Sequence, residues 1–275
     1  EELKEITEEL RNVNKKLAES EALKSHFISN ITNEIVNPFS SILGLSRNIL
    51  ALKEDNIQRA KPMAELIYSE AFDLDFQLKN IFAAAKLEAG EAFPEFQNVD
   101  VDQLISSVVE TYKYKADQKQ LNIYFKFNLS PELKEKCYFR TDAEKLKLIV
   151  SNLMSNGIKY SNAANNVEVT AWIQEGLLKV MVKDYGIGID SKDLQTIFDR
   201  FKRINNTINS LNPGHGLGLS VVKSMLDLLN GTIEIVSRKN QGSVFTVSFP
   251  EGPKEDTDGL ATDGNEFLFD DQQVF

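Results

Sequence analysis

The stretch Phe27–Phe39, FISNITNEIVNPF, sets the register of the first long helix that the sequence predicts. Apolar residues recur along and beyond it at spacings of three, four and seven, at Phe27, Ile31, Ile35, Ile42, Leu45 and Ile49. This period places them on one face of a helix. Asn33 lies two residues after Ile31, about 200° around the helix, so it points away from that face. Asn37 is one turn further on, on the same outward side, and Glu34 is next to Asn33.

A second apolar helix follows the first after the polar connection Lys53–Gln58. Pro62 suits its first turn, where the missing proline N–H would have no intrahelical acceptor. Its apolar stripe comprises Met63, Leu66, Leu74, Leu78, Ile81 and Ala85. Gly90 is placed to end this helix as its C-cap. One such hairpin has too little core to stand alone, so we expect two copies to form a four-helix bundle in a homodimer.

Residues 1–24 predict an amphipathic helix with its own apolar seam. Leu3, Ile6, Leu10, Val13 and Leu17 alternate at spacings of three and four, as in a coiled coil. Two compatible interpretations stay open: a generic dimer seam in a truncated helix, and a signalling helix that carries conformational input. The chain begins at Glu1 without Met, so we expect the cytoplasmic piece of a longer protein with an upstream sensor domain.

Composition excludes several classes of function. The 275 residues suffice for two domains, and 42% hydrophobic residues suffice for a core. A net charge of −10 and a pI near 4.9 give nucleic-acid binding no electrostatic support. The single cysteine, Cys137, excludes a disulfide framework and fits a reducing compartment. No apolar run approaches the roughly 18 residues of a membrane span, so we expect no membrane contact by this segment.

From Phe93 onward, short helical and strand patterns succeed one another. They predict helices at Val101–Gln118, Thr141–Tyr160 and Val221–Leu229, and strands at Leu121–Asn128, Val167–Ile173, Leu177–Lys183, Thr232–Ser237 and Ser243–Phe249. This order predicts an α/β sandwich with a mixed sheet. After Pro250 the chain is acidic and rich in glycine, as expected of a linker. The predicted fold class is therefore α+β: a helical hairpin followed by an α/β sandwich.

The stretch around Asn33 resembles the phosphoacceptor box of sensor histidine kinases, in which a Phe, an Asn and a Ser or Thr lead into His-Glu. The matching residues are Phe27, Asn30, Thr32, Glu34, Asn37 and Pro38. The phosphoacceptor does not match, because position 33 is Asn. Its amide nitrogen lone pair is delocalised and cannot attack a γ-phosphate as an imidazole nitrogen does. Two origins are open: a natural relative that has lost the acceptor, and a laboratory substitution.

Four further motifs resemble the ATP-binding module that histidine kinases share with gyrase-, chaperone- and mismatch-repair-type ATPases. They are Asn152–Ser161 (NLMSNGIKYS), Asp184–Gly188 (DYGIG), Ile197–Arg203 (IFDRFKR) and Gly214–Leu219 (GHGLGL). Each is modest alone, but their order after a helical hairpin is specific. The polar loop Asn205–Pro213 is expected to be the flexible ATP lid. The resemblance covers roughly residues 20–250 and implies ATP and Mg²⁺ as cofactors.

The resemblance implies that the first motif binds the phosphates and the metal ion. Asn156 would supply an amide oxygen to Mg²⁺, a hard cation that takes oxygen ligands, and Asn152 would support the phosphates. Lys159 would reach a phosphate, and Tyr160 would lie against the base or ribose. The related ATPases carry Glu at the position of Asn152 to activate water, and Asn cannot act as that base. Bound ATP should therefore be held for phosphoryl transfer.

The other motifs complete the expected site. The Asp184 carboxylate would accept from the adenine amine, and Gly186 and Gly188 would let the backbone approach the base. Arg203 resembles an Arg that can reach the γ-phosphate. Backbone N–H groups at a glycine-rich helix start form an anion cradle, which the sequence places at Gly214, Gly216, Leu217 and Gly218.

The resemblance implies a second activity at Glu34 and Asn37. The family Glu serves as general base toward the acceptor His, and the residue at the position of Asn37 can position a water to attack the aspartyl phosphate of a response regulator. We therefore expect that phosphatase activity toward the regulator's receiver domain can survive Asn33. The alternative is that Asn37 only turns the chain before Pro38.

The two histidines are weaker candidates for a functional role than the motif residues. His215 is interpreted as a loop residue within the glycine-rich motif. His26 lies seven residues before Asn33 on nearly the same helical face, about 10 Å away, and no acidic residue follows it directly. His26 is a conceivable substitute phosphoacceptor, but this interpretation is disfavoured.

The first interpretation is the catalytic core of a two-component sensor histidine kinase whose autophosphorylation is blocked by Asn33. Its expected domains are a coiled-coil signalling helix (1–24), a dimerisation and phosphoacceptor hairpin (25–92), a catalytic ATP-binding domain (93–250) and an acidic tail (251–275). The alternative is a non-catalytic ATP-binding pseudokinase scaffold that binds a regulator or another kinase. A stand-alone ATPase is disfavoured by Asn152.

Overall fold

The computed structural model describes residues 6–8, 10–11, 13–14, 35–128, 138–199 and 216–253. Several predicted features lie outside these ranges: Asn33, Glu34, His26, Cys137, Arg203, Gly214, His215, the expected lid and the tail from 254 onward. Of the predicted N-terminal seam, Ile6, Leu10 and Val13 are helical and exposed. The domain boundaries drawn from the sequence stay predictions.

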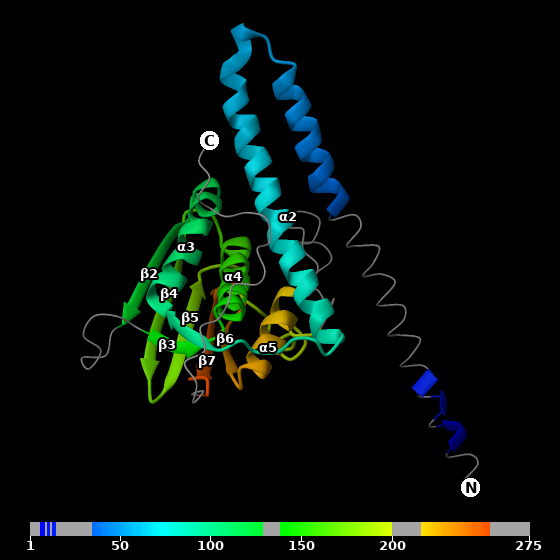
Figure 1. Ribbon diagram of the computed structural model, residues 1–275, viewed down its shortest axis with the longest axis vertical. Coiled ribbons are helices and arrows are strands. Elements are labelled where there is room, and N and C mark those ends of the chain that lie inside the picture. The colour runs from blue at the N-terminus through cyan, green and yellow to red at the C-terminus, as the bar shows by residue number, and fades with distance from the viewer. Residues whose placement is uncertain are drawn as a thin grey trace.

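A helical hairpin rises above the rest of the molecule (Figure 1). It pairs a helix at 35–50 with α2 (Ala60–Glu88), and the 3₁₀ helix η1 (Glu54–Arg59) lies between them. The polar connection predicted at Lys53–Gln58 is thus mostly 3₁₀ helix rather than an open loop. The predicted stripe of the first helix is half-buried wherever it is described, at Ile35, Ile42, Leu45 and Ile49.

The end of α2 follows the chemistry predicted for Gly90. Gly90 has a φ of +69°, and its N–H donates to the Leu87 carbonyl at 3.3 Å. The N–H of Glu91 donates to the Lys86 carbonyl at 2.9 Å. This pair of bonds is the Schellman motif, which needs a left-handed residue directly after the helix. The predicted helix end is confirmed.

The second part of the chain is a mixed sheet with helices packed on it. The elements are β1 (Gln97–Asp100), α3 (Val101–Gln118), β2 (Asn122–Asn128), β3 (Tyr138–Thr141), α4 (Ala143–Tyr160), β4 (Asn166–Gln174), β5 (Leu177–Asp184), α5 (Gly218–Leu228), β6 (Thr232–Ser237) and β7 (Ser243–Pro250). The five-stranded sheet has the order β2-β4-β5-β7-β6, with β2 and β4 parallel and the other pairs antiparallel. The predicted mixed sheet is confirmed.

One face of this sheet forms the core. Alternate residues of β4, β5 and β7 are buried, including Val169, Val180 and Val247. Alternation of this kind marks a sheet covered on one side. Figure 1 shows α3, α4 and α5 on that side, with α2 beyond them. The core therefore holds α4, which carries the first ATP-binding motif, between the sheet and the hairpin.

The sequence did not predict two short strands. β1 and β3 form a separate antiparallel pair, and Thr141, predicted to begin a helix, is the last residue of β3. Asp142 then caps α4, because its Oδ1 accepts from the Lys145 N–H at 2.9 Å. Its Oδ2 accepts from the Glu95 N–H at 2.8 Å, which ties this cap to the segment before β1.

Helix α2 packs on the sheet domain mainly through residues outside the predicted stripe, although Ile81 of that stripe also packs against the core. The rings of Phe72 and Phe76 meet Tyr112 of α3 edge-on, with centroids 5.4 and 6.4 Å away. Asp73 forms an ion pair with Lys115, whose pKa burial lowers to about 8 while Glu70 acts in the opposite direction. The hairpin and the sheet domain therefore share an interface in which α2 contacts α3, α4 and α5.

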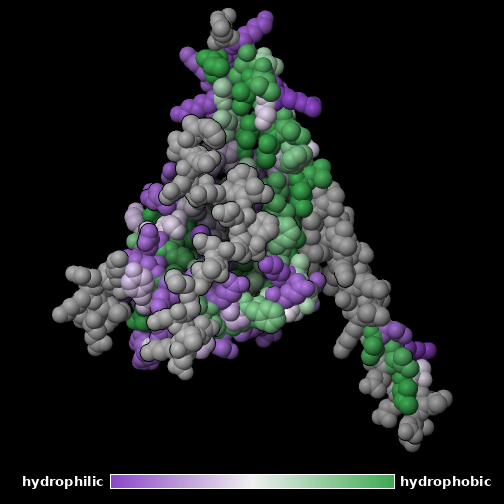
Figure 2. Space-filling model, in the orientation of Figure 1, coloured by the Kyte–Doolittle hydropathy of each residue, from purple (hydrophilic) through white to green (hydrophobic). Residues whose placement is uncertain are grey.

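The hairpin leaves a second apolar stripe uncovered. On the helix at 35–50, Val36, Phe39, Leu43 and Leu50 are exposed. On α2, Phe82 is exposed, and so is Leu66, which belongs to the stripe predicted for that helix. Figure 2 shows hydrophobic surface along the hairpin. Within the part of the chain that the structure describes, none of the helices is long and apolar enough to cross a membrane.

Candidate nucleotide-binding site

Helix α4 presents the residues of the first motif in order of increasing exposure. Asn152 is 2% exposed, Asn156 and Lys159 are half-buried, and Tyr160 is 37% exposed. Their spacings of four, three and one place the first three on one helical face. The Lys159 ammonium lies 5.2 Å from the centre of the Tyr160 ring. The motif thus runs from an enclosed amide to an open basic and aromatic end.

The Asn152 side chain is held between α2 and the start of α5. Its Nδ2 donates to Asn80 Oδ1 at 2.8 Å and to the Leu148 carbonyl at 2.9 Å. A Cβ at position 218 would lie 2.6 Å from Asn152 Oδ1, so the amide oxygen faces the backbone of Gly218. Two predicted motifs that are far apart in the sequence therefore touch here.

The described part of the glycine-rich motif forms the turn into α5. Gly216 has a φ of +68°, Leu217 is buried, and Gly218 is the first residue of the helix. The first N–H groups of a helix have no intrahelical acceptor, and they attract anions. Gly216–Gly218 thus form a turn into a helix start beside Asn152, and their role as a phosphate cradle stays a prediction.

Asp184 is the last residue of β5. It is 5% exposed, and its Oδ1 accepts from the Gly186 N–H at 2.9 Å. Burial raises the pKa of the Asp184 carboxyl, and hydrogen bonds from Gly186 and Ser243 act in the opposite direction. A carboxylate in this setting is a buried acceptor, as recognition of an amine requires.

The two glycines after Asp184 are required by the protein's own backbone. Gly186 pairs with Ser161 in an isolated bridge, and a Cβ at position 186 would overlap the Tyr160 carbonyl. Gly188 has a φ of +61°, and a Cβ there would overlap the Arg238 carbonyl. The Gly186 contacts bring the Asp184 loop against the end of α4, and the Gly188 contact brings it against the turn after β6. Their suggested contact with a base stays a prediction.

A lysine outside the motifs fixes the same end of α4. Lys119 Nζ donates to the carbonyls of Ile158, Lys159 and Ser161 at 2.9, 2.5 and 3.2 Å. Burial lowers the pKa of Lys119. A cation at a helix C-terminus satisfies free carbonyls and opposes the helix dipole. Nothing in the local sequence around Lys119 signals this role, because its partners lie about 40 residues away.

The structure thus brings some of the predicted site residues into contact, whereas others are separate or lie outside the described residues. Asn152 meets Gly218, and Tyr160 meets Gly186. Asn37 is exposed on the helix at 35–50, and its predicted neighbours Asn33 and Glu34 lie outside the described residues, as do Arg203 and Gly214. Asn80 and Lys119 are contact residues that sequence reasoning did not find.

The donors suit a nucleotide with a hard cation better than a metal held by protein alone. In the described ranges no three His, Cys, Asp or Glu side chains are grouped to hold a metal ion. Asn152 Oδ1 faces a glycine that leaves no room for a Cβ, and Asn156 lies one turn along α4. Amide oxygens with phosphate oxygens are a donor set that Mg²⁺ accepts. The arrangement is therefore compatible with ATP and Mg²⁺.

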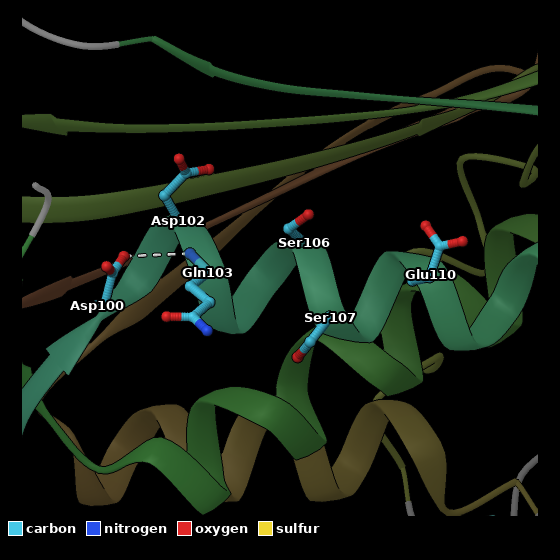
Figure 3. Close-up of a pocket in the computed structure, with 6 residues that line it drawn as sticks. All are labelled: Asp100, Asp102, Gln103, Ser106, Ser107 and Glu110. Carbon is cyan, nitrogen blue, oxygen red and sulfur yellow. Dashed lines mark hydrogen bonds between the residues drawn. The ribbon is translucent and has the colours of Figure 1, made fainter. Parts of the chain in front are cut away.

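A shallow hollow on α3 is a different feature. Figure 3 shows Asp100, Asp102, Gln103, Ser106, Ser107 and Glu110 lining it, and the hydrogen bond between the Gln103 N–H and Asp100 caps the helix at 3.1 Å. Its carboxylates would repel phosphates, and none of its lining residues belongs to the four motifs. It is not part of the nucleotide site.

Comparison with known proteins finds a matching domain family and related kinases. Residues 141–253 match the model of the histidine kinase-, DNA gyrase B-, and HSP90-like ATPase family. The sensor-like histidine kinase SenX3 of Mycolicibacterium smegmatis is 30% identical over 236 residues, which are 86% of this chain and 60% of that protein. The chain therefore spans little more than half of that relative's length.

Two solved structures have a similar fold. Full-length ShkA in complex with AMPPNP matches with a TM-score of 0.55 and 22% identity, over 85% of this chain and 47% of that one. Histidine kinase ThkA in complex with the response regulator TrrA matches with a TM-score of 0.52 and 19% identity, over 86% of this chain and 65% of that one. These two structures show the same fold, and the family match together with the sensor-like histidine kinase relative supports a histidine kinase-type ATP-binding domain at residues 141–253.

Proposed function

We propose that the chain is the catalytic core of a two-component sensor histidine kinase that holds ATP–Mg²⁺ for phosphoryl transfer. The observation that carries this proposal is the contact of Asn152 Oδ1 with Gly218, because it joins the amide motif of α4 to the glycine turn of α5. Amide oxygens beside the free N–H groups of a helix start suit a nucleotide phosphate with its cation.

The proposal gives roles to the polar and aromatic residues of the motifs and to the glycine turn. Asn156 gives an oxygen to Mg²⁺, and Lys159 binds a phosphate at the open end of α4. Asn152 supports the phosphates through the bound cation, because both of its N–H groups are already bonded within the protein. Tyr160 lies against the base or ribose, and Asp184 accepts from the adenine amine. The N–H groups after Gly216 hold the phosphates, with Arg203 and Gly214 completing the site from segments outside the described residues.

Position 33 sets the limit of the chemistry. The family reaction needs an imidazole there, and an Asn amide is not a nucleophile toward phosphate. We therefore expect ATP binding without autophosphorylation. Asn152 also cannot serve as the base that activates water, so bound ATP is held rather than rapidly hydrolysed.

The proposed partners are a second copy of the chain and a response regulator. The exposed stripe Val36, Phe39, Leu43 and Leu50 recurs at three, four and seven, which is the pattern of a helical bundle seam. A homodimeric four-helix bundle would cover it. ThkA, a structural relative, is bound to a response regulator in its solved structure. The chain would work as the cytoplasmic part of a sensor.

Nucleotide binding is the direct test. A fluorescent ATP analogue titrated into the full chain with Mg²⁺ should bind, and Asn156→Ala should lose most of the Mg²⁺-dependent affinity. Gly44→Ala is the matched control, because no atom lies within 4 Å of a Cβ at that position on the hairpin. Absence of saturable binding by the parent chain would contradict the proposal.

Response-regulator phosphatase activity is the second part of the proposal. Asn37 is exposed on the helix at 35–50, where a receiver domain could reach it. We expect the cognate regulator, phosphorylated on its Asp, to lose phosphate faster with the chain than without it. Asn37→Ala should remove the acceleration, with Asn48→Ala, an exposed Asn on the same helix, as the control. Equal decay with and without the chain would refute this activity.

The scaffold alternative rests on Asn33 itself, since a chain without an acceptor can still bind a regulator or another kinase in an ATP-dependent way. It predicts that ATP changes partner affinity and that restoring the imidazole at position 33 gives no transfer. The kinase-core proposal predicts that transfer returns.

A further inference from the structure

Helix α2 contributes a buried amide next to the candidate nucleotide site. Asn80 is 4% exposed, and its Oδ1 accepts from Asn152 Nδ2 at 2.8 Å. Its own Nδ2 donates to the Phe76 carbonyl at 2.9 Å. Because that bond directs the nitrogen of Asn80 toward its own helix, the oxygen is the atom presented to Asn152.

This contact decides which atom of the Asn152 amide faces the glycine turn. The two hydrogens of Asn152 Nδ2 go to Asn80 and to the Leu148 carbonyl. A carboxamide has one oxygen and one nitrogen on opposite branches, so occupying the nitrogen turns the oxygen the other way. That oxygen is the atom found against Gly218.

The packing around the pair holds α2 in this register. Phe72 and Phe76 contact the ring of Tyr112, which is 2% exposed. Burial raises the pKa of Tyr112, and a hydrogen bond with the side chain of Ser151 acts in the opposite direction. Ser151 directly precedes Asn152, so the same interface fixes two consecutive residues of α4.

We propose that Asn80 is a positioning residue for the nucleotide site: it holds the Asn152 amide with its oxygen, rather than its N–H groups, toward the bound nucleotide and Mg²⁺. This inference rests on the proposed function, because it requires Asn152 to belong to that site. An amide oxygen interacts with a hard cation and not with a bare phosphate. The contribution of Asn80 therefore falls on the Mg²⁺-dependent part of nucleotide binding.

A consequence is that the hairpin and the nucleotide site are coupled through one hydrogen bond between buried side chains. Moving α2 away from α4 would leave an N–H of Asn152 without its acceptor and free the amide to reorient. A buried amide without a hydrogen-bond partner costs free energy. A displacement of α2 away from α4 would therefore change the orientation of the Asn152 amide in the nucleotide site.

The test uses the full chain and a fluorescent ATP analogue, titrated once with Mg²⁺ and once with EDTA. Asn80→Leu keeps the size of the side chain and removes the acceptor. We expect Kd to rise about fivefold with Mg²⁺, the effect of losing one neutral hydrogen bond, and to stay unchanged with EDTA. In an Asn152→Ala background, Asn80→Leu should change Kd no further.

Two further variants separate positioning from packing. Asn80→Asp retains an oxygen acceptor whether the carboxyl is ionised or protonated, so it should restore Kd to within about twofold of the parent value. Leu87→Val trims a side chain of α2 that packs against the same core and leaves the amide pair intact, so it should leave Kd unchanged. If Asn80→Leu melts below the assay temperature, Asn80→Ala takes its place.

The possible results are distinct. Failure of the parent chain to bind the analogue would contradict the proposed function itself. If the parent chain binds and Asn80→Leu leaves Kd unchanged, or raises it equally with Mg²⁺ and with EDTA, Asn80 serves only the packing of α2 on the sheet domain. Tighter binding by Asn80→Leu would show that Asn80 competes with the nucleotide for Asn152, which is the reverse of this inference.

Discussion

Gly218→Ala is the substitution that most sharply perturbs the geometry of the candidate site. A Cβ at this position would lie 2.6 Å from Asn152 Oδ1, whereas carbon–oxygen contacts begin at about 3.3 Å. Relieving the overlap by moving the amide requires a displacement of about 0.7 Å. The Asn152 amide lies between Gly218 and Asn80, whose Oδ1 is already 2.8 Å from Asn152 Nδ2, so a shift of that size away from Gly218 would compress this hydrogen bond or force the amide to rotate.

Gly218→Ala is expected to lower both the free energy of unfolding and the affinity for ATP–Mg²⁺. Overpacking of this kind destabilises a fold by about 1 to 3 kcal/mol. A displaced Asn152 amide should also weaken ATP–Mg²⁺ binding by about tenfold, equivalent to about 1.4 kcal/mol. Both follow from one contact between the first and fourth motifs.

The assay measures the Kd of a fluorescent ATP analogue with Mg²⁺, together with urea unfolding followed by circular dichroism. Gly44→Ala is the control, because nothing lies within 4 Å of its Cβ and the position is helical. It should stabilise the chain by up to about 1 kcal/mol and leave Kd unchanged. A folded Gly218→Ala variant that binds with the parent Kd would refute the reasoning.

Two further predictions concern groups around the site. Because burial raises the pKa of Asp184, and protonation removes an acceptor for the adenine amine, nucleotide affinity should fall on acidification at a higher pH than for an exposed aspartate. Kd measured from neutral to mildly acidic pH tests this, and a flat profile in the parent chain would contradict it. Lys119→Met should lower the free energy of unfolding by about 1 to 2 kcal/mol, because three carbonyls at the end of α4 lose a charged donor. Urea unfolding measures it against Lys113→Met, an exposed lysine of α3, and equal stability of the two variants would show that the Lys119 contacts contribute nothing.

Sequence periodicity predicted the strongly patterned elements well. The bounds of α3 and β6 agree with the prediction, and α4 begins two residues later than predicted. β1 and β3 escaped notice because each has four residues, too few to show alternation, and because their pairing joins segments about 40 residues apart. Short strands that depend on a distant partner carry little local signal.

The face of α2 that contacts the sheet domain was missed for a different reason. Of the predicted stripe, Ile81 packs against the core and Leu66 is exposed, whereas Phe72, Phe76 and Asn80 follow a separate period of four along the same helix. A polar residue in that row conceals it from a search for apolar spacing. Only the three-dimensional arrangement shows that Asn80 faces Asn152.

The candidate site was predictable where motifs carry it. Asn152 and Gly218 were both named from sequence, and the structure brings them into contact. The glycines at 186 and 188 were expected to make room for a ligand, whereas the structure explains them by close approach of the carbonyls of Tyr160 and Arg238. Sequence alone does not distinguish those two reasons for a glycine.

The most direct test of the central claim is transfer of label from γ-labelled ATP with Mg²⁺, comparing the chain with its Asn33→His variant. An intact kinase core that lacks only its acceptor predicts label on the variant and none on the parent chain. Label on neither, despite nucleotide binding, would contradict the kinase-core account and favour the scaffold. Label on the parent chain would contradict the role given to Asn33 and direct attention to His26.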